Sequence, residues 1–173
     1  MTDTTLTPTR LWKNMTAAQR FAAARAFWLD EQATDDQVQA VMLIAQQKKF
    51  RAKTVFALEV DRKAKHLASI VNLPEGLAAR TLIVYHLAEQ RPMMAAFLDA
   101  LGIAHEDGLI KEDSVAPDAE KLAPAAAQIA QQYPAEDVSL YLQTLLCQDP
   151  TTWAGLADVI ASKSEGGSLK SEA

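Results

Sequence analysis

The chain has 173 residues, a formal net charge of −5 at pH 7 and 49% hydrophobic residues. This length and hydropathy suit a globular domain with its own core, and they exclude a wholly disordered chain. No apolar run approaches the roughly 18–20 residues that a membrane span needs, and the run from Leu82 to Tyr85 ends at His86. The sequence therefore predicts a protein without a membrane partner.

Cysteine content predicts the cellular compartment. The chain contains one cysteine, Cys147, so no disulfide can form within it. Residues 1–8 lack the basic and apolar segments of a secretory signal peptide. We therefore expect a cytoplasmic protein in which Cys147 is a small buried hydrophobic residue, because no adjacent basic side chain would stabilise its thiolate.

Helix start signals are frequent in the first half of the chain. The segments that begin at Thr16 and Thr34 match the capping box, in which a hydroxyl and a glutamine side chain satisfy free amides of the first turn. The next apolar stripe predicts one helix over residues 53–71. Residues 81–88 would place apolar side chains on nearly every face of a helix, which predicts a buried helix over residues 75–90.

Prolines and a glycine mark the helices of the second half. Pro92 is placed to open a helix that Gly102 ends in the left-handed conformation. Pro124 predicts that the next helix begins near Lys121, with the proline in its first turn. Two further prolines are placed to open the last two helices.

Together these signals predict an all-α fold without a sheet, an irregular bundle of about eight short helices arranged as consecutive αα-hairpins. Residues 16–162 form one helical domain in this prediction, after a flexible arm at residues 1–15 and before a disordered tail at residues 163–173. The domain includes a long acidic loop at residues 104–119. The helices are expected at about residues 16–31, 34–50, 53–71, 75–90, 92–102, 121–133, 134–148 and 150–162.

Positive charge is concentrated between residues 48 and 66, which hold seven basic and two acidic side chains. Clustered Lys and Arg can bind a polyanion through its phosphates. Glu59 and Asp61, however, stand four residues before Lys63 and Lys65, a spacing at which ion pairs stabilise an exposed helix face. The pattern favours that solvated face. The candidate polyanion-binding residues are Lys48, Lys49, Arg51, Lys53 and Arg62.

Residues 64–82 match the apolar spacing of the first helix and turn of a helix-turn-helix motif. The second helix of such a motif presents polar and basic side chains to base edges, whereas here it offers Arg80 alone before an apolar run. The chain is also acidic overall. The sequence therefore disfavours nucleic acid as the partner and keeps this motif as an alternative.

His86 and Glu89 stand three residues apart on one predicted helix face, next to Tyr85. Tyr85, His86 and Glu89 are the candidate catalytic or ligand-binding residues of a helical bundle. A two-metal bundle site also needs Glu-x-x-His sets, and the sequence contains none. His86 is better explained as a histidine at the core edge with a backbone or side-chain partner. We expect no cofactor, and the pattern favours a protein without enzymatic activity.

The acidic loop at residues 104–119 carries five acidic side chains and one lysine. Its Asp-Gly dipeptide fits the middle of a calcium-binding loop, but the first and last ligand positions hold an apolar residue and a serine. The sequence therefore predicts no metal site, with His105, Asp107 and Glu112 as weak candidates for another cation. Leu109 and Ile110 are expected to attach the loop to the protein or to a partner.

No pattern in the sequence assembles a nucleophile, a base and an oxyanion site. We therefore expect a protein-interaction or adaptor module, which binds a protein partner or self-associates through the basic segment and the acidic C-terminal half. Two alternatives stay open. One is a small ligand-binding or enzymatic bundle near His86, and the other is a helix-turn-helix-like nucleic-acid binder through residues 64–82.

Overall fold

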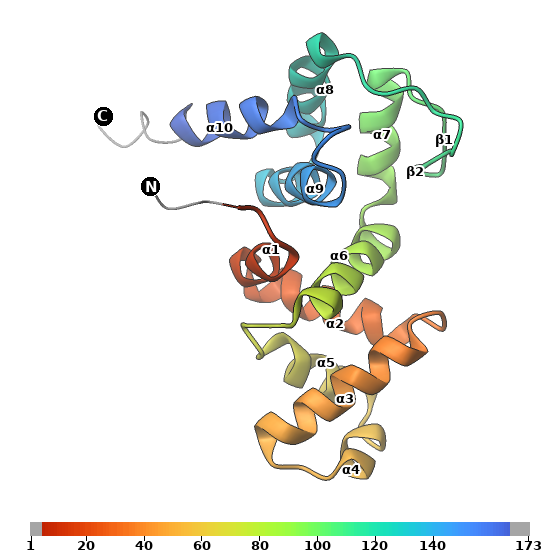
Figure 1. Cartoon of the computed structure of the whole chain (residues 1–173), viewed down its shortest axis with the longest axis vertical. Coiled ribbons are helices and arrows are strands. Elements are labelled where there is room, and N and C mark those ends of the chain that lie inside the picture. Colours follow the sequence, from red (N-terminus) through yellow and green to blue (C-terminus); the bar gives the residue numbers. More distant parts are fainter. Residues whose placement is uncertain (1–4, 167–173) are drawn as a thin grey trace. The chain divides into compact units, whose positions relative to one another are not determined.

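The computed structural model describes residues 5–166. These residues form ten helices and one ribbon of two short strands, so the fold is all-α, as the sequence predicted (Figure 1). The ribbon was not expected, and helices α1 and α4 add to the predicted set. The chain divides into two compact units, residues 1–89 and 90–173, where the sequence predicted one helical domain.

Unit 1 contains six helices. Helix α2 packs against both α5 and α6, while α1 packs against α6, and α3 packs against α4, α5 and α6. The helices are α1 (Pro8–Asn14), α2 (Ala17–Leu29), α3 (Thr34–Lys48), α4 (Ala52–Phe56), α5 (Val60–Ala68) and α6 (Glu75–Glu89).

Helix α1 lies within the segment that was expected to be a flexible arm. The Thr7 hydroxyl caps its first turn by accepting the amide of Arg10. Trp12 is fully buried, and its indole N–H donates to the carbonyl oxygen of Ile70 at 2.8 Å. The arm prediction is therefore wrong for residues 8–14. A two-turn helix is too short to show a periodic stripe, and its stability comes from tertiary burial.

One of the two predicted capping boxes is present. The Thr16 hydroxyl accepts the Gln19 amide at 3.1 Å, and the Gln19 side chain accepts the Thr16 amide at 3.0 Å. The second box is wrong, because Thr34 is already helical. The side-chain amide of Gln37 instead donates at 2.8 Å to two carbonyl groups near the C-terminal end of α2. Gln37 therefore caps the preceding helix.

The single helix predicted over residues 53–71 is two helices, α4 and α5, separated by residues 57–59. Leu67 of the expected apolar stripe is buried, whereas Phe56 and Val71 are 51% and 39% exposed. The break allows α5 to pack against α2 while Phe56 remains in solvent.

Helix α6 confirms the buried helix predicted over residues 75–90. Thr81, Leu82 and Val84 are all buried on it. Its neighbours are α1, α2 and α3. Among the residues that the structure describes, no helix has the length and hydropathy to cross a membrane.

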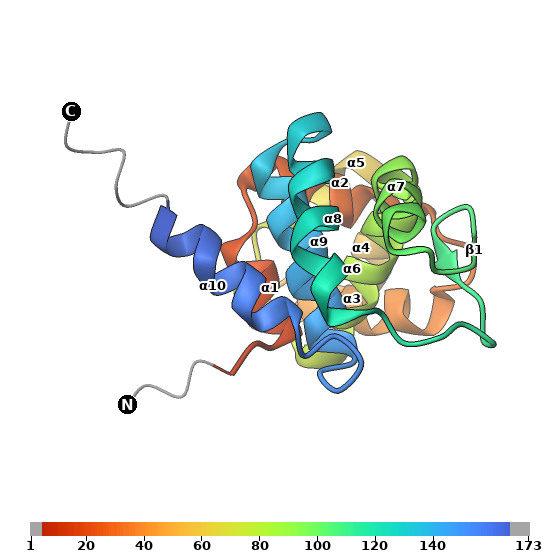
Figure 2. The same ribbon diagram turned by 90° about the horizontal axis from the view of Figure 1, so that it is seen from above.

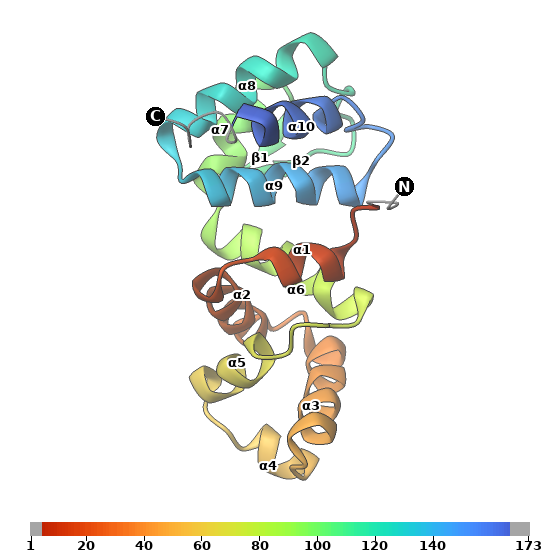
Figure 3. The same ribbon diagram turned by 90° about the vertical axis from the view of Figure 1, so that its left-hand side faces the viewer.

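Unit 2 contains four helices and the two-stranded ribbon. Helix α8 packs against α7, α9 and α10, and α10 also packs against α9 (Figure 3). The Phe97 ring lies at the centre of an aromatic cluster, with centroids 5.6 Å from Tyr141 and 6.2 Å from Trp153. The elements are α7 (Arg91–Leu101), β1 (His105–Glu106), β2 (Leu109–Ile110), α8 (Ala119–Gln132), α9 (Ala135–Gln148) and α10 (Leu156–Gly166).

The helix ends of unit 2 follow the predictions in part. Gly102 ends α7 with φ +68°, as expected, and the amide of Ile103 donates to the Leu98 carbonyl at 3.0 Å. Helix α8 begins at Ala119 with Pro124 in its interior, so the start predicted near Lys121 is wrong. Packing of α8 against three other helices compensates for the one backbone hydrogen bond that Pro124 cannot make.

Helix α10 begins later and ends later than predicted. Asp149 accepts the amide of Thr152 at 3.1 Å, but turns follow it and α10 begins at Leu156. The helix continues to Gly166, so the predicted disordered tail is wrong for residues 163–166. Residues 167–173 of that tail lie outside the described part of the chain. Cys147, expected to be buried, is half-buried in α9.

Candidate functional site

The acidic loop contains a β-hairpin. Strands β1 and β2 pair antiparallel, with Glu106 opposite Leu109. Asp107 and Gly108 form the turn, and their φ values of +50° and +88° are positive at both central positions, as a type I′ turn requires. Asp-Gly is a strong sequence signal for this hairpin. The calcium-loop interpretation treated the same dipeptide as part of a ligand loop and missed it.

Gly108 holds the hairpin against α7, and Figure 2 shows β1 beside that helix. A Cβ atom at Gly108 would lie 2.9 Å from Cβ of Met94 and 3.2 Å from the carbonyl oxygen of Arg91. Only glycine permits so close an approach together with the positive φ. The Arg91 guanidinium also donates to the carbonyl oxygen of Asp107 at 3.1 Å. Backbone packing and this hydrogen bond therefore fix the hairpin.

His105 has a structural role in the hairpin. Its Nε2 lies 2.7 Å from Oδ1 of Asp99, and its Nδ1 accepts the amide of Gly108 at 3.1 Å. Because Nδ1 accepts, the proton of the neutral ring lies on Nε2 and is donated to Asp99. Within residues 5–166, no group of three or more His, Cys, Asp and Glu side chains could hold a metal. The structure does not bring His105, Asp107 and Glu112 together as ligands.

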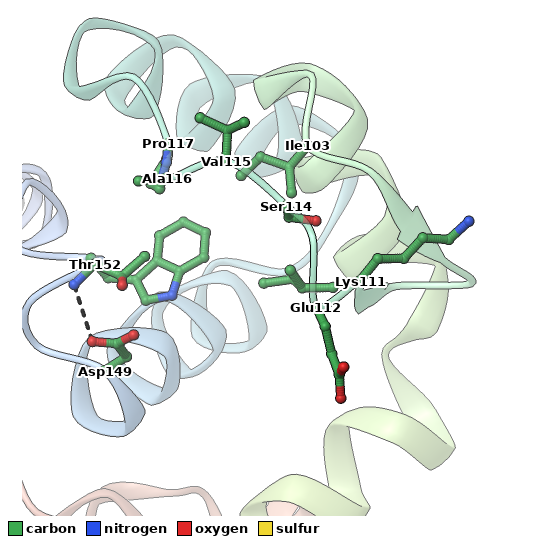
Figure 4. A pocket seen from close by; sticks show the side chains of 11 residues that line it. Ile103, Lys111, Glu112, Ser114, Val115, Ala116, Pro117, Asp149 and Thr152 are labelled. Atoms are coloured by element: carbon green, nitrogen blue, oxygen red, sulfur yellow. Dashed lines mark hydrogen bonds between the residues drawn. The ribbon is translucent and has the colours of Figure 1, made fainter.

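A cavity of about 420 Å³ lies in unit 2 beside the segment that follows the hairpin (Figure 4). Its lining comes from residues 103–117 and from residues 149–153, which meet only in the folded chain. Sequence reasoning missed it because no local pattern links these segments. The apolar lining includes Ile103, Ile110, Val115, Pro117 and Trp153, and the polar lining includes Lys111, Glu112, Ser114, Asp149 and Thr152.

Asp149 provides negative charge at this cavity. Hydrogen bonds from the side chain and the amide of Thr152 lower the pKa of the Asp149 carboxyl group. Asp149 is therefore ionised at neutral pH. In Figure 4 the Lys111 side chain extends away from Asp149 and Thr152.

The hairpin and the residues after it carry exposed apolar side chains among acidic ones. Leu109, Ile110 and Val115 are 45%, 42% and 83% exposed, so the two predicted interaction residues are available to a partner. We call this the acidic segment. Its acidic members are Glu106, Asp107, Glu112 and Asp113, all of them exposed.

Six basic side chains of unit 1 are exposed around the C-terminal end of α3, on α4 and its N-cap, and on α5. Phe50 and Phe56, which lie among them in the sequence, are 41% and 51% exposed. We call this set the basic surface. Its basic members are Lys48, Lys49, Arg51, Lys53, Arg62 and Lys65.

The ion pairs that the sequence suggested for this surface do not form. Glu59 is the N-cap of α5, and Asp61 pairs with Arg25 of α2, with 3.0 Å between Oδ1 and Nε. The Nζ atom of Lys63 lies 5.1 Å from the ring centroid of Trp28. In the part of the chain that the structure describes, no ion pair involves a basic-surface residue. The surface therefore keeps its positive charge.

His66 lies within the field of the basic surface. Its ring is edge-on to Phe50, with 5.5 Å between the centroids. Burial lowers the pKa of His66, and the positive charges of Lys48 and Arg62 lower it further. Charges on α3 and α5 therefore act on the same imidazole.

We expect Lys48→Gln to raise the pKa of His66, because one of the positive charges that disfavour its protonation is removed. Since the folded-state pKa is below the ordinary value of 6.5, neutral His66 contributes stability above that pH, and the contribution is lost as the pH falls. NMR titration of the His66 ring protons in both proteins measures the shift. Lys13→Gln, which removes an exposed charge from α1, is the control. An unchanged pKa in Lys48→Gln would contradict the proposed field.

His86 has a hydrogen-bond partner on its own helix. The ring is buried, and its Nδ1–H donates to the carbonyl oxygen of Leu82 at 2.8 Å, one helical turn earlier. Tyr85 is also buried, with its ring centroid 5.4 Å from that of His86. Glu89 is exposed at the end of α6. This arrangement fits a core histidine with a backbone partner.

Residues 64–82, the segment of the helix-turn-helix alternative, include the end of α5 and the first half of α6. Helices α5 and α6 both pack against α2, and Leu82 and Val84 of the second helix are buried. Arg80 lies near two carboxylates, 3.7 Å from Asp30 and 3.6 Å from Asp36. These residues differ from the exposed polar and basic side chains that a recognition helix presents to base edges.

Two features remain without a structural explanation, the basic surface of unit 1 and the acidic segment with its cavity in unit 2. Both combine exposed charge with exposed apolar side chains. No protein-family model, no curated protein and no solved structure matches the chain.

Proposed function

We propose that the protein is a self-associating interaction module, in which the basic surface of one copy binds the acidic segment of another. Charge supports this pairing. Residues 1–89 hold 12 basic and 9 acidic side chains, a net charge of +3, while residues 90–173 hold 5 and 13, a net charge of −8. The observation that carries the proposal is the basic surface itself, which is exposed and without ion pairs among the described residues.

Apolar side chains make the two surfaces complementary beyond charge. Phe50 and Phe56 are exposed on the basic surface, and Leu109, Ile110 and Val115 are exposed on the acidic segment. Protein interfaces commonly combine an apolar centre with a charged rim. Complementary charges at the rim orient the partners and accelerate their encounter.

The proposed contact joins two different surfaces, so it is a head-to-tail contact. Such contacts generate closed rings or open chains. The association should weaken with salt, because exposed charges are screened within about 10 Å at 0.1 M ionic strength.

Charge reversal on the basic surface tests the proposal. The double variant Lys48→Glu, Arg51→Glu should weaken self-association by at least about tenfold, because like charges then face each other across the interface. Sedimentation velocity over a range of protein and salt concentrations measures it. Arg10→Glu, Lys13→Glu is the matched control, since it makes the same charge change on exposed residues of α1.

A mixing experiment identifies the second surface. Glu112→Lys, Asp113→Lys should also self-associate at least about tenfold more weakly than the wild type when alone, but it retains an intact basic surface. Mixed with the Lys48→Glu, Arg51→Glu variant, it should form a 1:1 complex. A wild-type protein that stays monomeric at low salt, or a basic-surface variant that associates as the wild type does, would overturn the proposal.

Nucleic acid is a second anion that the basic surface could attract, and the charge of −8 on unit 2 disfavours it. Retention of a monomeric wild-type protein on single-stranded RNA, abolished by Lys48→Glu, Arg51→Glu, would support that partner and count against self-association.

A further inference from the structure

Phe56 is more exposed than Phe50, at 51% against 41%, and lies at the C-terminal end of the short helix α4. Phe50 is held by a ring contact with His66. Lys53 lies three residues before Phe56 on α4, so both side chains leave from the same face of the helix. Unit 1 therefore presents an aromatic ring next to a positive charge.

The cavity of unit 2 has the size and lining to receive such a ring. Its volume of about 420 Å³ lies within the range of about 300–1,000 Å³ typical of pockets that bind organic groups. Trp153 and Ile103, which line it, are only 4% and 8% exposed. An entering ring would reach the small part of these side chains that faces the cavity, where the indole ring of Trp153 favours edge-to-face or offset contact.

The negative charge around the cavity is complementary to the positive charge of Lys53. Glu112 and Asp149 belong to its lining, and the Lys111 side chain extends away from Asp149 (Figure 4). The hydrogen bonds from Thr152 lower the pKa of the Asp149 carboxyl group. A lysine that arrives with the aromatic ring would thus find carboxylates beside the cavity.

We infer that Phe56 of one copy inserts into the cavity beside Trp153 of a second copy and brings Lys53 near Glu112 and Asp149. This inference rests on the proposed self-association and identifies Phe56 as the anchor, the side chain that contributes most to binding. A buried aromatic side chain in a pocket, next to a charged rim, is the usual form of an interface hot spot. Other exposed apolar residues then contribute shape and little affinity.

Phe56→Ala tests the role of the inserted side chain. It should weaken self-association by at least about tenfold, as expected for a hot-spot truncation. Its unfolding midpoint should be close to that of the wild type, since the side chain is half exposed. Leu29→Ala is the matched control, because Leu29 is 53% exposed on α2 and is not a member of the basic surface.

Two measurements test the cavity. Ala116→Trp adds bulk to the lining from an exposed residue and should weaken association as strongly as Phe56→Ala. The indole N–H resonance of Trp153, assigned with Trp153→Phe, should shift as the wild-type protein associates and should remain unchanged over the same concentrations of Phe56→Ala.

The outcomes separate this inference from the proposed function. If the wild type associates and Phe56→Ala associates equally, the anchor is wrong while the charge-driven contact stands. If Phe56→Ala is weakened but Ala116→Trp and the Trp153 resonance show no effect, Phe56 binds elsewhere and the cavity assignment is wrong. A wild type that is monomeric at low salt overturns both proposals.

Discussion

Trp12→Ala is expected to lower the free energy of unfolding by about 3–5 kcal/mol, the usual range for truncation of a buried aromatic residue. Trp12 is fully buried, and α1 packs against α6. The substitution would leave a cavity and also remove the donor to the Ile70 carbonyl oxygen, now bonded at 2.8 Å. Denaturant unfolding followed by circular dichroism measures the loss.

Two further variants separate the contributions. Trp12→Phe keeps an apolar ring and removes the indole N–H, so it should cost roughly 1–3 kcal/mol, the penalty for one unsatisfied buried polar group plus a small loss of packing. Leu29→Ala, at a residue that is 53% exposed, should change stability by less than about 0.5 kcal/mol. A loss below about 1 kcal/mol for Trp12→Ala would mean that α1 does not dock, as the flexible-arm prediction had it.

Gly108→Ala is expected to release the hairpin from α7. The added Cβ would lie 2.9 Å from Cβ of Met94 and 3.2 Å from the Arg91 carbonyl oxygen, at a φ of +88°. Steric overlap in a packed contact costs about 1–3 kcal/mol, and the positive φ adds about 1 kcal/mol. Because the hairpin can separate from α7 locally, faster hydrogen exchange at the Gly108 and Lys111 amides should accompany the loss of stability.

Gly102→Ala is the control for backbone strain alone. Gly102 has φ +68°, but no atom lies within 4 Å of a Cβ built there. We expect a loss near 1 kcal/mol and no change in exchange at the hairpin amides. Equal losses for the two glycine variants, with the hairpin amides still protected in Gly108→Ala, would show that close packing on α7 does not hold the hairpin.

The predictions that the structure confirms rest on local chemistry. The capping box at Thr16 and Gln19 and the left-handed Gly102 each involve residues within a few positions of one another. The buried helix α6 follows from an apolar circumference that no exposed helix would tolerate. Such signals are read within one or two helical turns, so the sequence is sufficient to predict them.

The predictions that failed depend on distant partners. Gln37 caps the preceding helix because that end lies within reach in the fold, although its own sequence context matches a capping box. Phe56 does not join the expected apolar stripe because the helix is interrupted between α4 and α5. Trp12 is buried because Ile70, 58 residues later, supplies a carbonyl acceptor.

The candidate site divides in the same way. The sequence by itself determined the all-α class, the basic character of residues 48–66 and the acidic character of residues 104–119, because composition and periodicity are properties of the chain. Tertiary structure alone decided that Asp61 forms its ion pair with Arg25 and not with Lys65. It also decided that residues 103–117 and Trp153 line one cavity. Ion pairing and cavity formation depend on distances between side chains, and only the packing of the helices sets those distances.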